Sequence, residues 1–321
     1  MALVDMPLEE LKEYRPALTK KDDFDDFWKE TRAVSDSQPL NYKMERIDYI
    51  VKDVNAYKVF YDGFGKARIC GYYLTPGREG DDAFPGILFF HGYNGNKGQI
   101  NGYLKWVFLG FAVMAIDVRG QSGESVDNKV YPPPSVSGYM TKGVFSKNDY
   151  YYRGVYMDCL RAIDFLSTQE SIDISRLCLV GESQGGGLSL ATTSLDSRVK
   201  LVIAMIPYLC HFERAIEIAE TLENITYNEF KHLVNMCPER EREMYDTLSY
   251  FDNLNLCKDI EAKTFISVGL RDTCCPPSTA FAIYNRIKAE KKIDVYPFYG
   301  HDAGITLGYQ EKMLAYIMNN L

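Results

Sequence analysis

The chain has 321 residues, of which 46% are hydrophobic and 25% charged, a globular composition that excludes a largely disordered protein. Its net charge of −8 argues against a nucleic-acid partner, because proteins that bind a phosphate backbone usually carry a basic surplus. The longest strongly apolar run, residues 106–116, is shorter than the about 20 residues that cross a bilayer. The first residues lack the basic and apolar regions of a secretory signal, so we expect a cytoplasmic protein with no membrane partner.

Cysteine and histidine spacing gives no sign of a cofactor or a dedicated metal centre. None of the eight cysteines forms a C-x-x-C pair, and no two of the four histidines stand at ligand spacing, so we expect reduced thiols, no metal and no cofactor. The adjacent Cys274 and Cys275 are expected to be two reduced thiols, with a vicinal disulfide as the alternative.

The N-terminal part predicts a helical arm followed by an antiparallel edge. Within residues 1–40, acidic residues precede Phe24, Phe27 and Trp28, whose spacing is typical of a short amphipathic helix. Three segments then alternate polar and apolar residues and are separated by turn residues, as antiparallel strands do: residues 46–51, 57–61 and 67–72.

Beyond residue 85, short apolar segments alternate with longer ones, which predicts a mostly parallel sheet flanked by helices. The predicted strands are residues 86–90, 112–116, 177–180, 201–206, 264–268 and 293–296. Tyr156, Leu160, Ile163 and Leu166 recur at helical spacing and indicate a crossover helix. Two longer stretches interrupt the pattern: residues 120–148 predict an extended excursion, and residues 208–262 predict a helical, cap-like insertion into a single domain of residues 1–321.

The segment from Gly181 to Gly185 matches the pattern G-x-S-x-G, with Ser183 at its centre. It stands between a predicted buried strand and a helix-forming stretch, which is the context of a nucleophile elbow. A serine at such a sharp turn needs small residues two positions before and after it, because a side chain there would collide with neighbouring backbone. A phosphate-binding loop is disfavoured, because Leu188 rather than a lysine follows the last glycine.

A nucleophilic serine needs a base and an acid. In proteins with a nucleophile elbow on a mostly parallel sheet, these residues follow along the chain in the order Ser, acid, His. His301 is the histidine that lies in a loop after the last predicted strand, whereas His91 precedes the serine and His211 and His232 lie in the insertion. Asp272 follows the preceding strand and is the predicted acid. Asp294 falls inside a strand and Asp302 adjoins the histidine, so both are weaker candidates.

An oxyanion hole needs two backbone donors, which we assign to the N–H groups of Gln184 and Tyr93. His91 then has a structural role in the loop of Tyr93. Arg119-Gly120-Gln121 is interpreted as a loop brace rather than a substrate clamp. Residues 150–152, three consecutive tyrosines, are expected to pack a helix face against the core, with sugar stacking as the alternative.

Together these segments resemble the acetyl xylan esterase and cephalosporin C deacetylase family, carbohydrate esterase family seven. The resemblance covers essentially the whole chain, with one departure: the family usually has glutamate after the catalytic histidine, where this chain has Asp302. The segments that carry it are Asp25–Trp28, His91–Gly95, Arg119–Gln121, Gly181–Gly186, Pro207–Phe212 and Gly269–Thr279.

The resemblance implies an α/β-hydrolase fold, a Ser–His–Asp triad without metal, and removal of acetyl groups from xylo-oligosaccharides and cephalosporin C. It also implies an intracellular protein that forms hexameric rings. Pro207 and Tyr208, together with Tyr93, are candidates for the wall of a small acyl pocket. The alternatives are a lactone hydrolase or peptidase of the same fold, and a hydrolase-like binding protein without activity.

Overall fold

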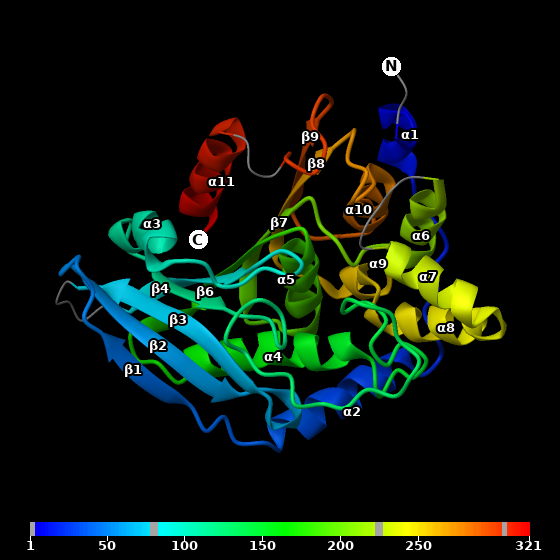
Figure 1. The fold of residues 1–321 in the computed structure, drawn as a ribbon. Coiled ribbons are helices and arrows are strands. Elements are labelled where there is room, and N and C mark those ends of the chain that lie inside the picture. The colour runs from blue at the N-terminus through cyan, green and yellow to red at the C-terminus, as the bar shows by residue number, and fades with distance from the viewer. Residues whose placement is uncertain (1–3, 78–82, 222–226, 304–306) are drawn as a thin grey trace.

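A nine-stranded sheet with the order β1-β2-β3-β5-β4-β6-β7-β8-β9 forms the centre of the molecule in the computed structural model (Figure 1). The structure describes residues 4–77, 83–221, 227–303 and 307–321. Strands β1, β2, β3 and β5 pair antiparallel, and every pairing from β5 through β9 is parallel. The strands are β1 Lys43–Ile47, β2 Val54–Asp62, β3 Arg68–Pro76, β4 Phe84–Phe90, β5 Ala112–Ile116, β6 Ile172–Glu182, β7 Val199–Met205, β8 Lys263–Gly269 and β9 Lys291–Tyr296.

The central strands are apolar throughout because both faces of the sheet are covered. In β6, Leu177 and Leu179 belong to one core cluster, whereas Cys178 and Val180 belong to the cluster on the opposite face. Alternate residues of a strand point to opposite faces, so a run without polar residues fits a strand buried on both sides. The predicted mostly parallel sheet is therefore confirmed.

Helices form a layer on each face of the sheet (Figure 1). Helices α3 and α11 contribute to one core cluster, whereas α4, α5 and α10 contribute to the other, together with α2 and the helices between β7 and β8. Among the described residues, no helix has both the length and the apolar character needed to span a membrane. The α-helices are α1 Leu8–Glu13, α2 Phe24–Asp36, α3 Leu104–Phe108, α4 Tyr151–Leu166, α5 Gln184–Leu195, α6 Phe212–Thr221, α7 Asn228–Met236, α8 Glu241–Phe251, α9 Asn253–Leu256, α10 Pro277–Tyr284 and α11 Leu307–Asn320.

The first strand differs from its predicted position. The sequence predicted residues 46–51, but β1 covers Lys43–Ile47, with Ile47 opposite Ala56 of β2. That register leaves residues 48–53 to connect the two antiparallel strands, so this segment cannot extend the ladder. The alternation continues into the connection because Tyr49 and Val51 still pack partly against the core.

The N-terminal arm packs against the helices that separate β7 from β8. Phe27 and Trp28 of α2 are buried, and the indole N–H of Trp28 donates to the carbonyl of Tyr250 in α8. Four α-helices, α6 to α9, occupy the described part of residues 208–262, and residues 222–226 lie outside the described residues. Residues 120–148 form turns and bends without a helix or strand, in keeping with the predicted excursion.

Strand β4 is the point at which the strand order reverses. Its two neighbours are β5 on one side and β6 on the other, both parallel to it. In open α/β sheets, ligands bind in the crevice beyond the carboxyl ends of the strands at such a switch point. The fold therefore indicates that a ligand site lies at the loops that follow β4 and β6.

Candidate active site

Ser183 lies at a sharp turn between β6 and α5. Its backbone has φ 54° and ψ −117°, a conformation that costs free energy for any residue other than glycine. The turn is possible because its flanking glycines pack backbone to backbone. A Cβ on Gly181 would lie 2.1 Å from the carbonyl carbon of Gly185, and a Cβ on Gly185 would lie 2.0 Å from the carbonyl oxygen of Phe90. The predicted steric need for both glycines is thus confirmed.

Hydrogen bonds to the neighbouring strand keep the elbow in place. The N–H of Ser183 donates to the carbonyl of Met205 at the end of β7, at 2.9 Å. The carbonyl of Ser183 accepts from the N–H of Tyr208, also at 2.9 Å. The residue is 8% exposed, so it is nearly but not fully buried.

His301 and Asp272 complete a hydrogen-bonded chain with this serine. Nε2 of His301 lies 3.0 Å from Oγ of Ser183, and Nδ1 of His301 lies 2.8 Å from Oδ2 of Asp272. Asp272 is fully buried, and its Oδ1 also accepts the N–H groups of Cys274 and Cys275 at 2.8 Å each. The structure thus brings together the three residues that the sequence selected, in the geometry of a nucleophile, a base and an orienting acid.

The loops that carry the acid and the base are packed onto one another. The N–H of Arg271 donates to the carbonyl of Tyr299 at 3.0 Å, and a Cβ on Gly269 would lie 2.3 Å from the carbonyl oxygen of Gly300. The rejected acids are engaged elsewhere: Asp294 pairs with Lys312, and Asp302 accepts the N–H of Gly300 within its own loop. Parallel pairing of β8 and β9 brings the two loops to the same edge of the sheet.

The electrostatics of the site connect His301 to Cys274 as well as to Asp272. Burial opposes protonation of His301, but hydrogen bonds to Asp272 and to Cys274 outweigh it and raise its pKa above the usual 6.5. The hydrogen bond with Cys275 lowers the pKa of Cys274, burial opposes that effect, and His301 lowers the pKa further. Because only a neutral imidazole can accept a proton, the acid limb of a reaction catalysed by His301 should lie above pH 6.5.

The loop after β4 lies directly against the nucleophile. A Cβ on Gly92, the residue before Tyr93, would be 3.9 Å from Cβ of Ser183. His91 fixes this loop: its Nδ1 hydrogen bonds to the carbonyl of Gly92, and its Nε2 accepts the N–H of Val118 at 2.9 Å. Burial lowers the pKa of His91, as suits a neutral structural imidazole.

The side chain of Tyr93 is held by the insertion, a contact that sequence reasoning missed. Its hydroxyl donates to Oε1 of Glu229 in α7 and accepts the N–H of Tyr139 at 2.7 Å. Oε2 of Glu229 accepts the N–H of Met140 at 3.0 Å. The contacts of Glu229 therefore join α7, the 120–148 excursion and the loop after β4. No local pattern marks Glu229, because its partners are remote in sequence.

Gln184 and Gln121 form a buried amide pair beneath the elbow. The two side chains exchange hydrogen bonds, with Nε2 of Gln121 lying 2.8 Å from Oε1 of Gln184. Oε1 of Gln121 also accepts the N–H of Asn94 at 2.8 Å, which connects the loop after β4 to the start of α5. The hydroxyl of Tyr152 completes the pair by donating to Oε1 of Gln184 at 2.9 Å.

Arg119 has the contacts of a brace rather than of a substrate clamp. Its guanidinium is 2% exposed and forms two hydrogen bonds of 2.6 Å to the carboxylate of Asp158 in α4. Its carbonyl accepts the hydroxyl of Tyr151, and all three tyrosines of residues 150–152 are buried. The expectation that these tyrosines pack against the core is confirmed.

The two candidates for the acyl pocket flank the elbow. Cα of Pro207 would lie 3.2 Å from a Cβ on Gly186, and Tyr208 hydrogen bonds to Ser183 through its backbone. The ring of Tyr208 packs edge-on against that of Tyr93, with centroids 6.3 Å apart. Both residues are therefore close to the nucleophile, whereas contact with an acyl group stays a prediction.

Comparison with known proteins places this geometry in a family. The family model "Acetyl xylan esterase (AXE1)" matches residues 1–320. An acetyl xylan esterase from a Paenibacillus species has a similar structure, with 41% identity, a TM-score of 0.94 and coverage of 98% of this chain and 100% of that chain. A more distant α/β hydrolase from a Penicillium species has 16% identity, a TM-score of 0.58 and coverage of 83% and 98%, and shares the fold alone. The predicted α/β-hydrolase fold is confirmed.

A curated relative is longer than this chain. Acetyl esterase Axe7A of Xylanibacter ruminicola is 29% identical over 298 residues, which cover 89% of this chain but 65% of the relative. The chain therefore spans just under two thirds of that protein's length. The match of the family model over nearly every residue, together with the 41% identical structure, shows that this chain belongs to the acetyl xylan esterase family.

Proposed function

We propose that the protein is a serine esterase that removes acetyl groups from O-acetylated sugars, with xylo-oligosaccharides as the substrate class. The observation that carries the proposal is the hydrogen-bonded chain Ser183–His301–Asp272, with distances of 3.0 and 2.8 Å, in a member of the acetyl xylan esterase family. Cephalosporin C, whose acetyl ester also joins a small acyl group to an alcohol oxygen, is proposed as a second substrate on the basis of the family resemblance.

The proposed reaction has two acyl-transfer steps. His301 accepts the hydroxyl proton of Ser183 as its oxygen attacks the acetyl carbonyl, and Asp272 stabilises the resulting imidazolium. The N–H groups of Tyr93 and Gln184 hold the oxyanion of the tetrahedral intermediate. His301 then protonates the leaving sugar oxygen, which produces an acetyl-enzyme and a free alcohol. Water attacks the acetyl-enzyme with His301 again as base, and His301 then returns the proton to Oγ of Ser183 as the bond to the acetyl group breaks and acetate leaves.

A small acyl pocket follows from the aromatic walls beside Ser183. Tyr93 and Tyr208 stand edge to face near the nucleophile, and Pro207 adjoins Gly186. Each additional methylene that must displace such a wall costs about 1–3 kcal/mol. We therefore expect p-nitrophenyl acetate to be hydrolysed at least about tenfold faster than the butyrate. Equal rates would contradict the proposed pocket.

The decisive experiment is acetate release from acetylated xylo-oligosaccharides and from cephalosporin C. The unmodified protein should release acetate, and Ser183→Ala should not. Ser175→Ala is the matched control, because Ser175 is exposed and its hydroxyl hydrogen bonds to the neighbouring Asp173 in the same strand. Labelling by a fluorophosphonate separates an enzyme from a binding protein, because that probe reacts only with an activated serine. Acetate release that persists in Ser183→Ala would overturn the proposal.

Two broader properties are proposed on the family resemblance: location in the cytoplasm and assembly as a hexamer. Light scattering of the purified protein measures the second directly. A monomer at all accessible concentrations would contradict it.

A further inference from the structure

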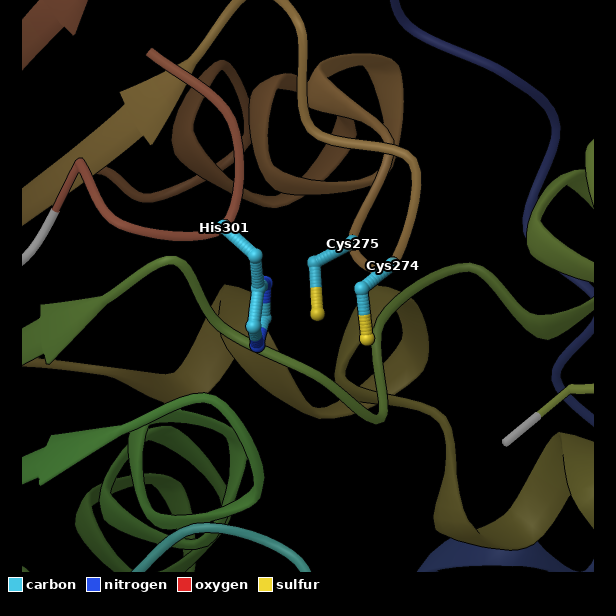
Figure 2. A group of neighbouring side chains, drawn as sticks. All are labelled: Cys274, Cys275 and His301. Atoms are coloured by element: carbon cyan, nitrogen blue, oxygen red, sulfur yellow. The ribbon is translucent and has the colours of Figure 1, made fainter. Parts of the chain in front are cut away.

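The thiols of two cysteines lie close to the imidazole of His301, the proposed catalytic base. Sγ of Cys274, Sγ of Cys275 and a ring nitrogen of His301 all lie within 4.8 Å of one another. Figure 2 shows the three side chains directed into the same space, the cysteines from the loop after β8 and the histidine from the loop after β9. The cysteines are present as thiols rather than as a disulfide.

This arrangement matches the size of a tetrahedral site for a thiophilic cation. Zn–S bonds of about 2.3 Å and Zn–N bonds of about 2.0–2.1 Å separate neighbouring ligand atoms by roughly 3.5–3.8 Å in a tetrahedron. None of the separations among the three atoms exceeds 4.8 Å, so they can reach this spacing through small side-chain movements. Two sulfurs and one imidazole nitrogen favour Zn²⁺ or Cd²⁺ over Mg²⁺ and Ca²⁺, which prefer oxygen ligands.

The groups around the cluster already orient it. Asp272 holds the imidazole through Nδ1 and holds the backbone of both cysteines through its other oxygen. A carboxylate that fixes a histidine ring in this way is the usual outer-shell partner of a metal-bound histidine. The same contact that prepares His301 as a base therefore prepares it as a ligand.

A second cluster among the described residues is a useful contrast. Cys70, Asp117 and Glu124 also lie within 4.8 Å of one another. There, however, the ammonium group of Lys97 hydrogen bonds to both carboxylates, at 2.7 and 2.8 Å, and supplies the positive charge. The cluster of Cys274, Cys275 and His301 instead consists of two thiols and an imidazole, so the two clusters differ in their donor atoms.

We propose that Cys274, Cys275 and His301 form an inhibitory site for a thiophilic divalent cation, represented by Zn²⁺ and Cd²⁺. Each thiol releases its proton to solvent as its sulfur binds the ion, and water fills the remaining position. His301 has one nitrogen bonded to Ser183 and the other to Asp272. Whichever nitrogen binds the ion, one triad contact is lost and the esterase stops. The inhibition rests on the proposed function, whereas the binding does not.

The test uses reduced, chelator-treated protein and two readouts. Cd²⁺ should produce the ultraviolet charge-transfer absorption of a cadmium thiolate, in the unmodified protein and in Ser183→Ala alike. Zn²⁺ and Cd²⁺ should inhibit hydrolysis of p-nitrophenyl acetate, the chelator should restore it, and Mg²⁺ should have no effect. If the unmodified protein showed the cadmium band but no esterase activity even without metal, the result would support the metal site and contradict the proposed function.

Variants identify the ligands. In Cys274→Ser, the Zn²⁺ concentration that halves activity should rise at least about tenfold relative to that variant's own metal-free rate, because a ligand is lost. Cys275→Ala should do the same and serves as the second variant if the first misfolds. Cys237→Ser is the matched control, since Cys237 is a partly exposed thiol at the end of α7. Unchanged inhibition and an unchanged cadmium band in both site variants would overturn the proposal.

Discussion

The two halves of the candidate site are held in place by different means. Ser183 is positioned by backbone: a positive φ, two close glycine contacts and hydrogen bonds to the end of β7 and the loop that follows. His301 is positioned by side chains: a buried carboxylate on one nitrogen and the serine hydroxyl on the other. The imidazole side chain is partly exposed, whereas Ser183 is buried.

Because the two halves are held differently, substitutions in them should differ in their effects on stability and on activity. A side chain added at Gly181 or Gly185 must disturb the main-chain packing around Ser183, so it should lower stability and activity together. A conservative change to Asp272 or His301 removes a side-chain hydrogen bond without adding atoms, so it should lower activity while leaving the fold intact. Measurements of stability beside activity therefore test the comparison, starting with the largest expected effect.

Asp272→Asn should give the largest loss of activity. The asparagine carbonyl can still accept the two backbone N–H groups, but its NH₂ group then faces Nδ1 of His301 and favours the wrong tautomer. We expect kcat for p-nitrophenyl acetate to fall roughly 10⁴-fold with little change in Tm. Asp302→Asn, beside the histidine, is the control and should remain close to the unmodified rate. A loss smaller than tenfold would remove Asp272 from the triad.

Gly185→Ala should affect stability and activity together. The added Cβ would lie 2.0 Å from the carbonyl oxygen of Phe90, a backbone atom in the middle of the sheet. We expect the free energy of unfolding, measured in urea, to fall by about 3 kcal/mol relative to the unmodified protein, the upper end of the usual cost of overpacking. Gly102→Ala is the matched control, because nothing lies within 4 Å of its added Cβ. If Gly185→Ala kept full stability and lost only activity, the distinction between the two halves would fail.

His211 should make the nucleophile half sensitive to acid. It follows the loop that supports Ser183, and burial, aided by the nearby Arg214, lowers its pKa to about 4. The unfolded chain takes up a proton below pH 6.5, but the folded chain does not until about pH 4. Stability should therefore fall across that interval, by up to about 3 kcal/mol from this residue.

Urea unfolding of His211→Gln at several pH values measures this contribution. The variant should lose less stability than the unmodified protein between pH 6.5 and about 4. His232→Gln, at an exposed position on α7, should behave like the unmodified protein. Identical pH profiles for all three proteins would exclude His211 as the source of acid sensitivity.

Glu229→Gln should have the smallest effect. A glutamine cannot accept from both Tyr93 and the N–H of Met140, since one of its two terminal groups is a donor. The loop after β4, which carries the proposed oxyanion donor Tyr93, should loosen, and we expect kcat/KM to fall roughly tenfold through the lost hydrogen bond to a charged group. Glu239→Gln, at an exposed position beyond α7, is the control. An unaltered kcat/KM would show that Tyr93 needs no support from the insertion.

The predictable and unpredictable parts of the site differ in sequence distance. Ser183 and its glycines form a local pattern, because a turn of five residues requires small neighbours. Asp272 and His301 followed from parallel strand order, which brings successive loops to one edge. Glu229 has no such signal, since its partner Tyr93 is 136 residues away and on a different element. The proximity of Cys274 to His301 likewise depends on how two loops pack, which spacing along the chain does not encode.

The contact between Glu229 and Tyr93 has a consequence for the order in which the chain folds. The loop of Tyr93 is made early in synthesis, Glu229 much later, and Asp272 and His301 later still. Pairings so far apart in sequence form slowly, after local helices and hairpins. A refolding chain should therefore regain its circular dichroism signal before it regains esterase activity. The delay between the two signals would include the time that α7 needs to pack against the rest of the molecule.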